Sequence, residues 1–135
     1  YIFLRHVLEH TSNPVNFIAE ISSLLNVDGK IVAEVPNYAC VWRKIFSSYF
    51  GMLSMPYHFF HFTKEALRNI FGRDYKMQFK VARVPVLYHS ISGMFGIEDN
   101  GFSAISIAFI PLQVAVETIF NSPTALLVII QKKGI

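Results

Sequence analysis

The sequence predicts an α/β fold in which a β-sheet is flanked by helices, and three observations carry this prediction. Two short apolar segments, 1–4 and 30–35, enclose a segment with the apolar spacing of a helix, which is the pattern of two parallel strands joined by a crossover helix. The segment 75–84 alternates apolar and polar residues, as an edge strand does. The run 124–131 is apolar throughout, as expected of an interior strand.

The composition is that of one small folded domain. The chain has 135 residues and is 53% hydrophobic, above the ~45–50% that is usual for globular domains. Its net charge is +3, and its basic residues are scattered apart from Lys132 and Lys133, so nucleic acid is not expected as a partner. The single cysteine, Cys40, excludes an internal disulfide and fits a reducing compartment such as the cytoplasm.

A helix is predicted to start at Pro14, soon after the first strand. Asn13 is a suitable N-cap, and Pro14 lacks only an N–H that the first helical position does not use. Apolar residues then recur at spacings of three and four: Phe17, Ile18, Ile21, Leu24 and Leu25. The pattern predicts an amphipathic helix of about three turns, followed by a turn into the second strand.

Aromatic residues dominate the segment 38–55 after the second strand. Four of them share one helical face: Trp42, Phe46, Tyr49 and Phe50. We expect a short helix and a loop over the strand ends, serving either as a lid for an apolar acceptor or as packing. A further helix is predicted from the N-cap Thr63 to Phe71, with Phe62 and Leu67 as its hydrophobic staple.

The segment 93–101 is predicted to be loop, and 102–120 is the longest apolar stretch. Its 19 residues approach the length of a membrane span, about 20 residues, but include a proline and a glutamate. Its polar residues form one narrow stripe: Ser103, Ser106, Gln113 and Glu117. We predict an apolar helical insertion that is kinked at Pro111 and packs on the domain. Contact with a membrane surface or a partner, and a spanning helix, remain alternatives.

Four stretches together resemble the C-terminal half of class I S-adenosylmethionine-dependent methyltransferases, within the group that acts on small molecules, lipids or sugars. The stretches are HVLEHTSNP at 6–14, DGKIVAEVPN at 28–37, PYHFFHFTKEALRNIF at 56–71, and the last apolar strand with its basic pair. The resemblance implies a partial Rossmann-like methyltransferase sheet. Its strands, in chain order the fourth to the seventh of the family, would be arranged 4-5-7-6 with the seventh antiparallel.

The resemblance also implies that 1–135 is the C-terminal part of one methyltransferase domain. The family's glycine-rich loop and the acidic residue that hold the cofactor would precede Tyr1, and the sequence has no Gly-x-Gly pattern. We therefore expect residues 1–135 alone to bind S-adenosylmethionine poorly and to be inactive. Two copies are expected to associate along the open edge of 1–4.

The implied reaction transfers a methyl group from S-adenosylmethionine to a small-molecule or lipid-like acceptor. The implied cofactor-binding residues are Leu4, Arg5 and His6, and the implied acceptor-binding residues are Asn37, Tyr57, His58 and His61. No catalytic residue is assigned and no metal is expected. The expected location is the cytoplasm, with peripheral membrane contact as an open alternative.

Two other functions stay open. His6, Glu9 and His10 match the His-x-x-Glu-His signature of a zinc hydrolase, which requires a long helix and a third ligand. Alternatively, Glu9 and His10 brace the turn into the helix, and the histidines of 56–63 are hydrogen-bonded loop residues. A non-enzymatic membrane-surface module, working through 102–120, is the second alternative.

Overall fold

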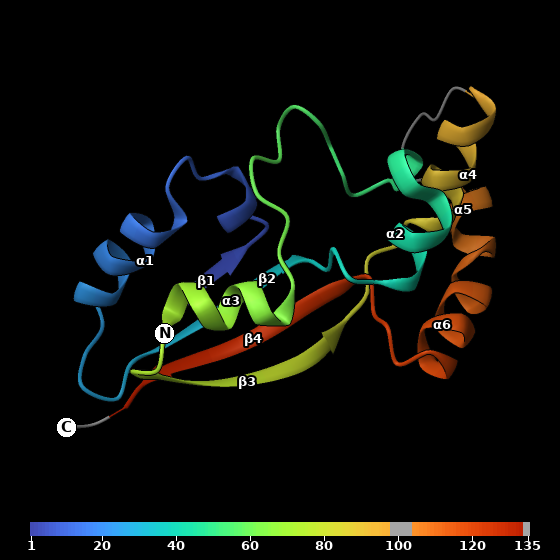
Figure 1. Ribbon diagram of the computed structural model, residues 1–135. Coiled ribbons are helices and arrows are strands. Elements are labelled where there is room, and N and C mark those ends of the chain that lie inside the picture. The colour runs from blue at the N-terminus through green and yellow to red at the C-terminus, as the bar shows by residue number, and fades with distance from the viewer. Residues whose placement is uncertain (98–103, 134–135) are drawn as a thin grey trace.

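The computed structural model describes residues 1–97 and 104–133 and contains a four-stranded mixed sheet in the order β1-β2-β4-β3 (Figure 1). The strands are β1 (Ile2–Arg5), β2 (Lys30–Pro36), β3 (Tyr75–Ala82) and β4 (Ala125–Lys132). β1 and β2 are parallel, whereas β4 is antiparallel to both of its neighbours. The predicted order 4-5-7-6 and the antiparallel last strand are therefore confirmed. Association of two copies along the edge strand β1 stays a prediction.

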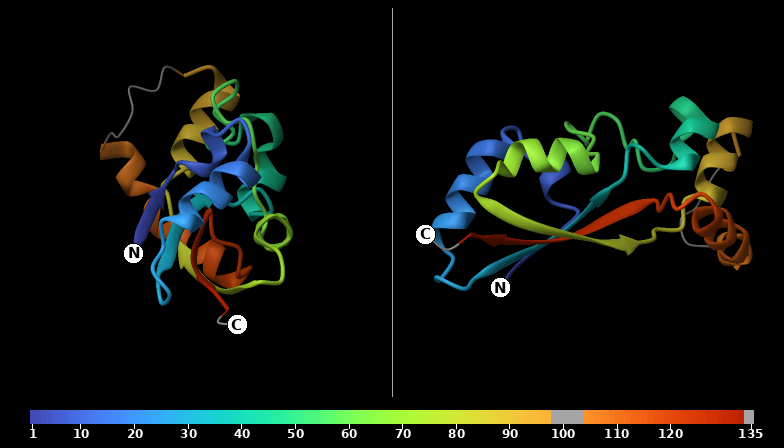
Figure 2. Two further views of the ribbon diagram at one scale, coloured as in Figure 1. Left: turned by 90° about the vertical axis from the view of Figure 1, so that its left-hand side faces the viewer. Right: turned by 60° about the horizontal axis from the view of Figure 1, so that its bottom comes forward.

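Two helices, α1 (Pro14–Ser23) and α3 (Lys64–Phe71), lie against one face of the sheet (Figures 1 and 2). Between them and the sheet lies the main core, built from alternate residues of the inner strands and from the apolar faces of both helices. Fully buried members include Ile31, Ala33, Val35, Leu67, Leu126, Val128 and Ile130. This core fixes which face of β2 points toward the helices, because a shift by one residue would expose it.

The starts of α1 and α3 are capped as predicted. Asn13 and Thr63 each accept a hydrogen bond from the backbone N–H three residues later, at 3.0 and 3.1 Å. The predicted apolar face of α1 ends early, however. Leu24 follows the last helical residue and is 75% exposed, so its place in that face was wrong.

Beyond the carboxyl ends of β1 and β2 lies a group of short helices that we call the helical cap (Figure 1). It comprises α2 (Val41–Phe46), η2 (Ser47–Tyr49), α4 (Leu87–Phe95), α5 (Ala104–Ala108) and α6 (Ile110–Ile119). Trp42, Phe46 and Phe50 are buried in its own small core, which favours packing over a lid. Tyr49 is half exposed and does not share their buried face, contrary to prediction.

Helix α4 was not predicted. The glycines of 93–101 suggested a loop, but Gly93 lies inside α4 and Gly96 ends it with a positive φ of 64°. Ser90 in α4 accepts a hydrogen bond from the backbone N–H of Gly51. Contacts with a distant segment thus stabilise a helix whose local sequence is a poor helix former. The remainder of the predicted loop, from residue 98, lies outside the described residues.

The predicted single helix over 102–120 is two helices, with α5 ending just before Phe109 and α6 beginning just after it. Pro111 lies in the first turn of α6, where its missing N–H costs nothing, rather than at a kink within a longer helix. Phe102 and Ser103 lie outside the described residues. None of the helices in the described ranges is long and apolar enough to cross a membrane.

The polar stripe of these two helices faces the protein interior. Gln113 is 3% exposed, and its Oε1 accepts hydrogen bonds from the backbone N–H groups of Val86 and Leu87 at 2.9 and 3.2 Å. Its Nε2 donates to the carbonyl of Val84 and to Glu117. Gln113 therefore satisfies three backbone groups that connect β3 to α4.

Glu117 holds α6 in the same orientation. It is 1% exposed, its Oε1 accepts from the indole N–H of Trp42 at 3.1 Å, and its Oε2 lies 3.2 Å from Nε of Arg83. Because the polar side chains of α5 and α6 face the protein interior, their apolar side chains face outward: Ile105, Ile107, Leu112, Val114 and Ile119. The orientation of α6 is thus determined by hydrogen bonds rather than by hydrophobicity.

The inward orientation of Gln113 leads to a prediction for stability in which a polar residue stabilises the protein more than the apolar residue next to it. Replacing Gln113 with Leu should lower the free energy of unfolding by at least about 2 kcal/mol, because buried backbone groups lose their partners. The opposite change next to it, Leu112→Gln, should have an effect within about 0.5 kcal/mol because Leu112 is 55% exposed. Urea denaturation of both variants measures the difference. A Gln113→Leu variant as stable as the wild type would contradict the inward orientation.

Candidate functional site

The parallel strands β1 and β2 end side by side, as predicted. Arg5 is paired with Glu34 in the register, and the backbone N–H of His6 donates to the carbonyl of Glu34 at 3.0 Å. His6 has a positive φ of 52°, so the chain turns sharply away from the sheet immediately after β1. Side chains that follow the two strands are therefore brought to one edge, where open α/β sheets bind ligands.

The segment 54–62 crosses this edge. The carbonyl of Glu9 accepts hydrogen bonds from the backbone N–H groups of Phe59 and Phe60, at 2.8 and 3.3 Å. At its end, the carbonyl of Phe62 accepts from the N–H of Tyr38 at 2.9 Å. The segment is thus attached both to the turn after β1 and to the turn after β2.

Six titratable side chains gather at this edge, and we call them the strand-end cluster. They are His6, Glu9, His10, Glu34, His58 and His61. Glu9 is completely buried, whereas His6 and His58 are partly buried and His10 is exposed. Most of these groups come from segments far apart in the sequence, so only the fold brings them together.

His6 is held between two carboxylates. Its Nδ1 lies 3.0 Å from Oε1 of Glu9 and its Nε2 lies 3.3 Å from Oε1 of Glu34. The hydrogen bond to Glu9 is the main cause that raises the pKa of His6, and the two negative charges add to it, against the opposing effect of burial. His6 therefore favours its protonated form more than a free histidine does.

The two histidines of the 54–62 segment have the opposite tendency. Burial is the main cause that lowers the pKa of both His58 and His61, and for His61 the positive charge of Arg43 adds to it. The ring of His61 stacks on the ring of Tyr38 with 5.0 Å between their centroids. The guanidinium of Arg43 also lies over the Tyr38 ring, 4.7 Å from its centre. Neutral imidazoles are therefore favoured here.

The residues predicted to bind the cofactor lie at the strand ends, but they differ in exposure. Leu4 is 7% exposed and belongs to the main core. The side chain of Arg5 is 79% exposed, with its Nε 3.6 Å from Glu34. His6 is partly exposed. Arg5 thus presents hydrogen-bond donors at this edge, whereas the ring of His6 is paired with Glu9 and Glu34 and Leu4 packs in the main core.

Of the residues predicted to bind the acceptor, Asn37 forms a β-bridge with Phe62, next to His61, but its side chain is buried and bonded within the protein. It is 6% exposed, its Nδ2 donates to the carbonyl of Pro123 at 2.8 Å, and its Oδ1 accepts from the N–H of Ala39. Tyr57 is exposed, and its carbonyl is bonded to His10. His58 belongs with His61 to the strand-end cluster.

Sequence reasoning missed part of the cluster. Glu9 and His10 were expected either to belong to a zinc signature with His6 or to brace the turn after β1, and Glu34 was expected only to be a strand residue. Glu9 does brace the site, because its carbonyl holds the 54–62 segment. The available signal was the pair of adjacent polar residues in the apolar context VLEHT, together with a glutamate near the end of β2.

The geometry of the His-x-x-Glu-His signature is not present. Only the single 3-10 turn η1 (Leu8–His10) follows β1, and His6 precedes it with its positive φ. A zinc hydrolase of this class needs both histidines on one α-helix. The zinc-hydrolase alternative is therefore wrong, because the backbone here does not form that helix.

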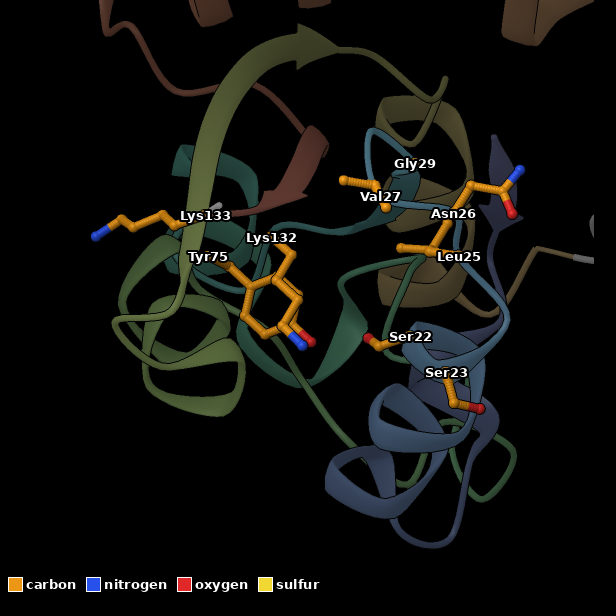
Figure 3. A pocket seen from close by; sticks show the side chains of 9 residues that line it. All are labelled: Ser22, Ser23, Leu25, Asn26, Val27, Gly29, Tyr75, Lys132 and Lys133. Atoms are coloured by element: carbon orange, nitrogen blue, oxygen red, sulfur yellow. The ribbon is translucent and has the colours of Figure 1, made fainter. Parts of the chain in front are cut away.

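A cavity of about 490 Å³ lies at the opposite end of the sheet, where β2 begins and β4 ends. Figure 3 shows Leu25, Tyr75 and Lys132 among the residues around it. Open α/β sheets bind ligands at the carboxyl ends of their parallel strands, which is the other edge. We therefore place the candidate site at the carboxyl edge with the strand-end cluster and not at this cavity.

Comparison with known families decides the class of protein. A family model described as a methyltransferase domain matches residues 1–75, which is more than half of the chain and includes both parallel strands and the 54–62 segment. The chain belongs to this methyltransferase family. No curated protein matches it. The methyltransferase family implies S-adenosylmethionine as the usual methyl donor.

The residues of this methyltransferase fit the donor as one wall of its site. At the carboxyl edge of β1, the exposed guanidinium of Arg5 offers N–H donors that suit the carboxylate and hydroxyl oxygens of S-adenosylmethionine, whereas both ring nitrogens of His6 face Glu9 and Glu34. The sequence contains no Gly-x-Gly loop to hold the remainder of the cofactor. Within this sequence, only the residues at the ends of β1 and β2 therefore suit S-adenosylmethionine.

The buried position of Asn37 leads to a prediction. Its replacement by Ala should destabilise the methyltransferase by about 2 kcal/mol, because the carbonyl of Pro123 and the N–H of Ala39 lose their partner. Asn69→Ala, on the exposed side of α3, should change stability by less than about 0.5 kcal/mol. Thermal and urea unfolding provide the measurement. An unchanged stability together with weaker acceptor binding would instead support direct contact with the acceptor.

Proposed function

We propose that the carboxyl edge of β1 and β2 forms part of the cofactor and acceptor sites of an S-adenosylmethionine-dependent methyltransferase for a small-molecule or lipid-like acceptor. The observation that carries this proposal is the meeting of two parallel strand ends with the strand-end cluster. Leu4, Arg5 and His6 are proposed to line the cofactor. Tyr57, His58 and His61 are proposed to border the acceptor.

Methyl transfer depends mainly on positioning, and a general base assists where the acceptor must lose a proton. When bound, S-adenosylmethionine supplies an electrophilic methyl group on a sulfonium. His61 is the proposed proton acceptor, because burial and the positive charge of Arg43 lower its pKa and favour its neutral form. Its stack on Tyr38 fixes the plane of the ring. In this proposal the chain orients the acceptor oxygen or nitrogen and removes its proton.

Calorimetric binding of S-adenosylmethionine to the full-length protein tests the proposed cofactor-binding residues. The double change Arg5→Ala and His6→Ala should weaken S-adenosylmethionine binding by at least about tenfold, because the exposed guanidinium of Arg5 is lost and Glu9 and Glu34 lose the ring that pairs with them. Lys76→Ala, on the exposed side of β3 and in register with the opposite end of the sheet where β2 begins, serves as the matched control and should leave the affinity unchanged. Calorimetry in which the double variant binds like the wild type would refute the assignment.

The outward surface of α5 and α6 supports a lipid-like acceptor. The exposed residues of 105–120 are apolar with the exception of Thr118, whose hydroxyl donates to a carbonyl of its own helix. α5 and α6 belong to the helical cap, which lies beyond the end of β2 (Figures 1 and 2). We propose that this surface docks on a lipid bilayer and that the acceptor is taken from it.

Two features favour a bilayer over a protein as the occupant of this surface. Protein interfaces contain about one hydrogen bond per 100–200 Å², whereas this surface offers almost no free polar group. The net charge of +3 also favours approach to an anionic membrane. Docking would place the cap helices in the headgroup layer without a spanning helix.

Co-sedimentation with vesicles of phosphatidylcholine and phosphatidylglycerol tests the docking. Changing Ile105, Leu112 and Ile119 to Ser should abolish sedimentation, since buried apolar area drives such binding. The same change at Val15, Leu24 and Val27, which are equally exposed but lie outside the cap, should preserve it. Loss of binding in both triple variants, or in neither, would contradict docking through the cap.

A further inference from the structure

Three potential metal ligands converge where η1 meets the 54–62 segment. One carboxylate oxygen of Glu9 and one ring nitrogen each of His10 and His58 all lie within 4.8 Å of one another. From this arrangement we propose that Glu9, His10 and His58 bind a divalent transition-metal ion such as Zn²⁺. This replaces the expectation of no metal that was drawn from the sequence, and it does not depend on methyl transfer.

The hydrogen bonds of the two histidines leave Nε2 of each ring available to a metal ion. Nδ1 of His10 lies 3.0 Å from the carbonyl of Tyr57, and Nδ1 of His58 lies 2.9 Å from the carbonyl of Met52. A carbonyl only accepts, so each Nδ1 carries the hydrogen and each neutral ring keeps its lone pair on Nε2. Histidines that bind metals are oriented in this way, with the other ring nitrogen donating to a carbonyl or carboxylate.

Glu9 provides an independent observation. Its side chain is 0% exposed, and Oε1 is bonded to His6, but Oε2 has no hydrogen-bond partner among the described residues. A buried carboxylate oxygen without a partner is costly, and a bound cation would satisfy it. The contact between His6 and Oε1 would then act as the supporting hydrogen bond that fixes the orientation of a metal-binding carboxylate.

The segments that carry the ligands are joined before any metal binds. The carbonyl of Glu9 accepts from the backbone N–H groups of Phe59 and Phe60, which fixes the chain next to His58. The rings of His10 and His58 approach edge to face with 4.7 Å between centroids. Ligands of one zinc ion lie roughly 3.4 Å apart, as follows from Zn–N distances of about 2.0–2.1 Å in a tetrahedron. Side-chain rotations that close at most about 1.4 Å would therefore complete the site.

The donor set indicates the class of metal. Two imidazole nitrogens and one carboxylate oxygen suit Zn²⁺ and its transition-metal neighbours rather than Mg²⁺ or Ca²⁺, which prefer oxygen ligands. Three protein ligands also leave a coordination position open, as in catalytic rather than structural zinc sites. If the proposed function holds, that position would take an oxygen atom of the acceptor.

Metal binding by the tag-free chain, stripped with EDTA and desalted, tests the proposal. Titration calorimetry with ZnCl₂ should give one ion per chain, and His10→Ala and His58→Ala should each weaken binding by at least about tenfold. His89→Ala, in α4 and outside the group, should bind as the wild type does. Because His10 is exposed, its variant should fold normally, which far-UV circular dichroism verifies.

Two results would overturn the proposal. One is the absence of stoichiometric Zn²⁺ binding by the wild-type chain, and the other is binding that both histidine variants leave unchanged. Co²⁺ substitution adds a spectroscopic test, because nitrogen and oxygen ligands should give visible bands without the sulfur-to-cobalt charge transfer that coordination by Cys40 would produce. None of these measurements involves methyl transfer, so a failure here is distinct from a failure of the proposed function.

Discussion

The parallel pairing of β1 with β2 is the constraint on which the candidate site depends. The register places Arg5 beside Glu34, and the hydrogen bond from His6 to the carbonyl of Glu34 extends the pairing to the point where β1 ends. The main core holds this register because its alternate residues are buried on the helix-covered face. Once the two strand ends are adjacent, the turns that follow them provide both the carboxylates and the anchors of the 54–62 segment.

Buried polar groups organise the molecule at two places. At the strand ends, Glu9 holds His6 with its side chain and the 54–62 segment with its carbonyl. In the helical cap, Gln113 and Glu117 satisfy backbone groups and Trp42 from the inside of α6. In both cases the hydrogen bonds of a buried polar residue, made by its backbone at the strand ends and by its side chain in the cap, hold a whole segment in position. The result is a partly buried titratable cluster at the edge of the sheet and an apolar outward surface on α5 and α6.

Local signals predicted much of the fold. The N-caps Asn13 and Thr63, the alternation along β3 and the continuous apolar run of β4 each depend on residues close together in the sequence, and all four were correct. Helix α4 could not be predicted, because contacts with distant segments stabilise it. Nor could the inward stripe of α6 be assigned, since apolar residues normally mark the buried face and only the partners of Gln113 reverse this rule.

Only part of the candidate site was predicted, because the rest depends on contacts between segments that are distant in the sequence. The strand ends were placed correctly because a crossover of this length makes two parallel neighbours. The grouping of Glu9 and His10 with His58 was missed, because it depends on how the 54–62 segment folds back across the edge.

The most direct test of the account is chemical-shift mapping of the ¹⁵N-labelled chain with S-adenosylhomocysteine, the unreactive product of the donor. The account predicts that the perturbed amides cluster at the end of β1 and the turn after it, around Arg5 and His6. Perturbations centred on the cavity at the other end of the sheet, near Leu25 and Tyr75, would contradict it, as would the absence of any perturbation at saturating ligand.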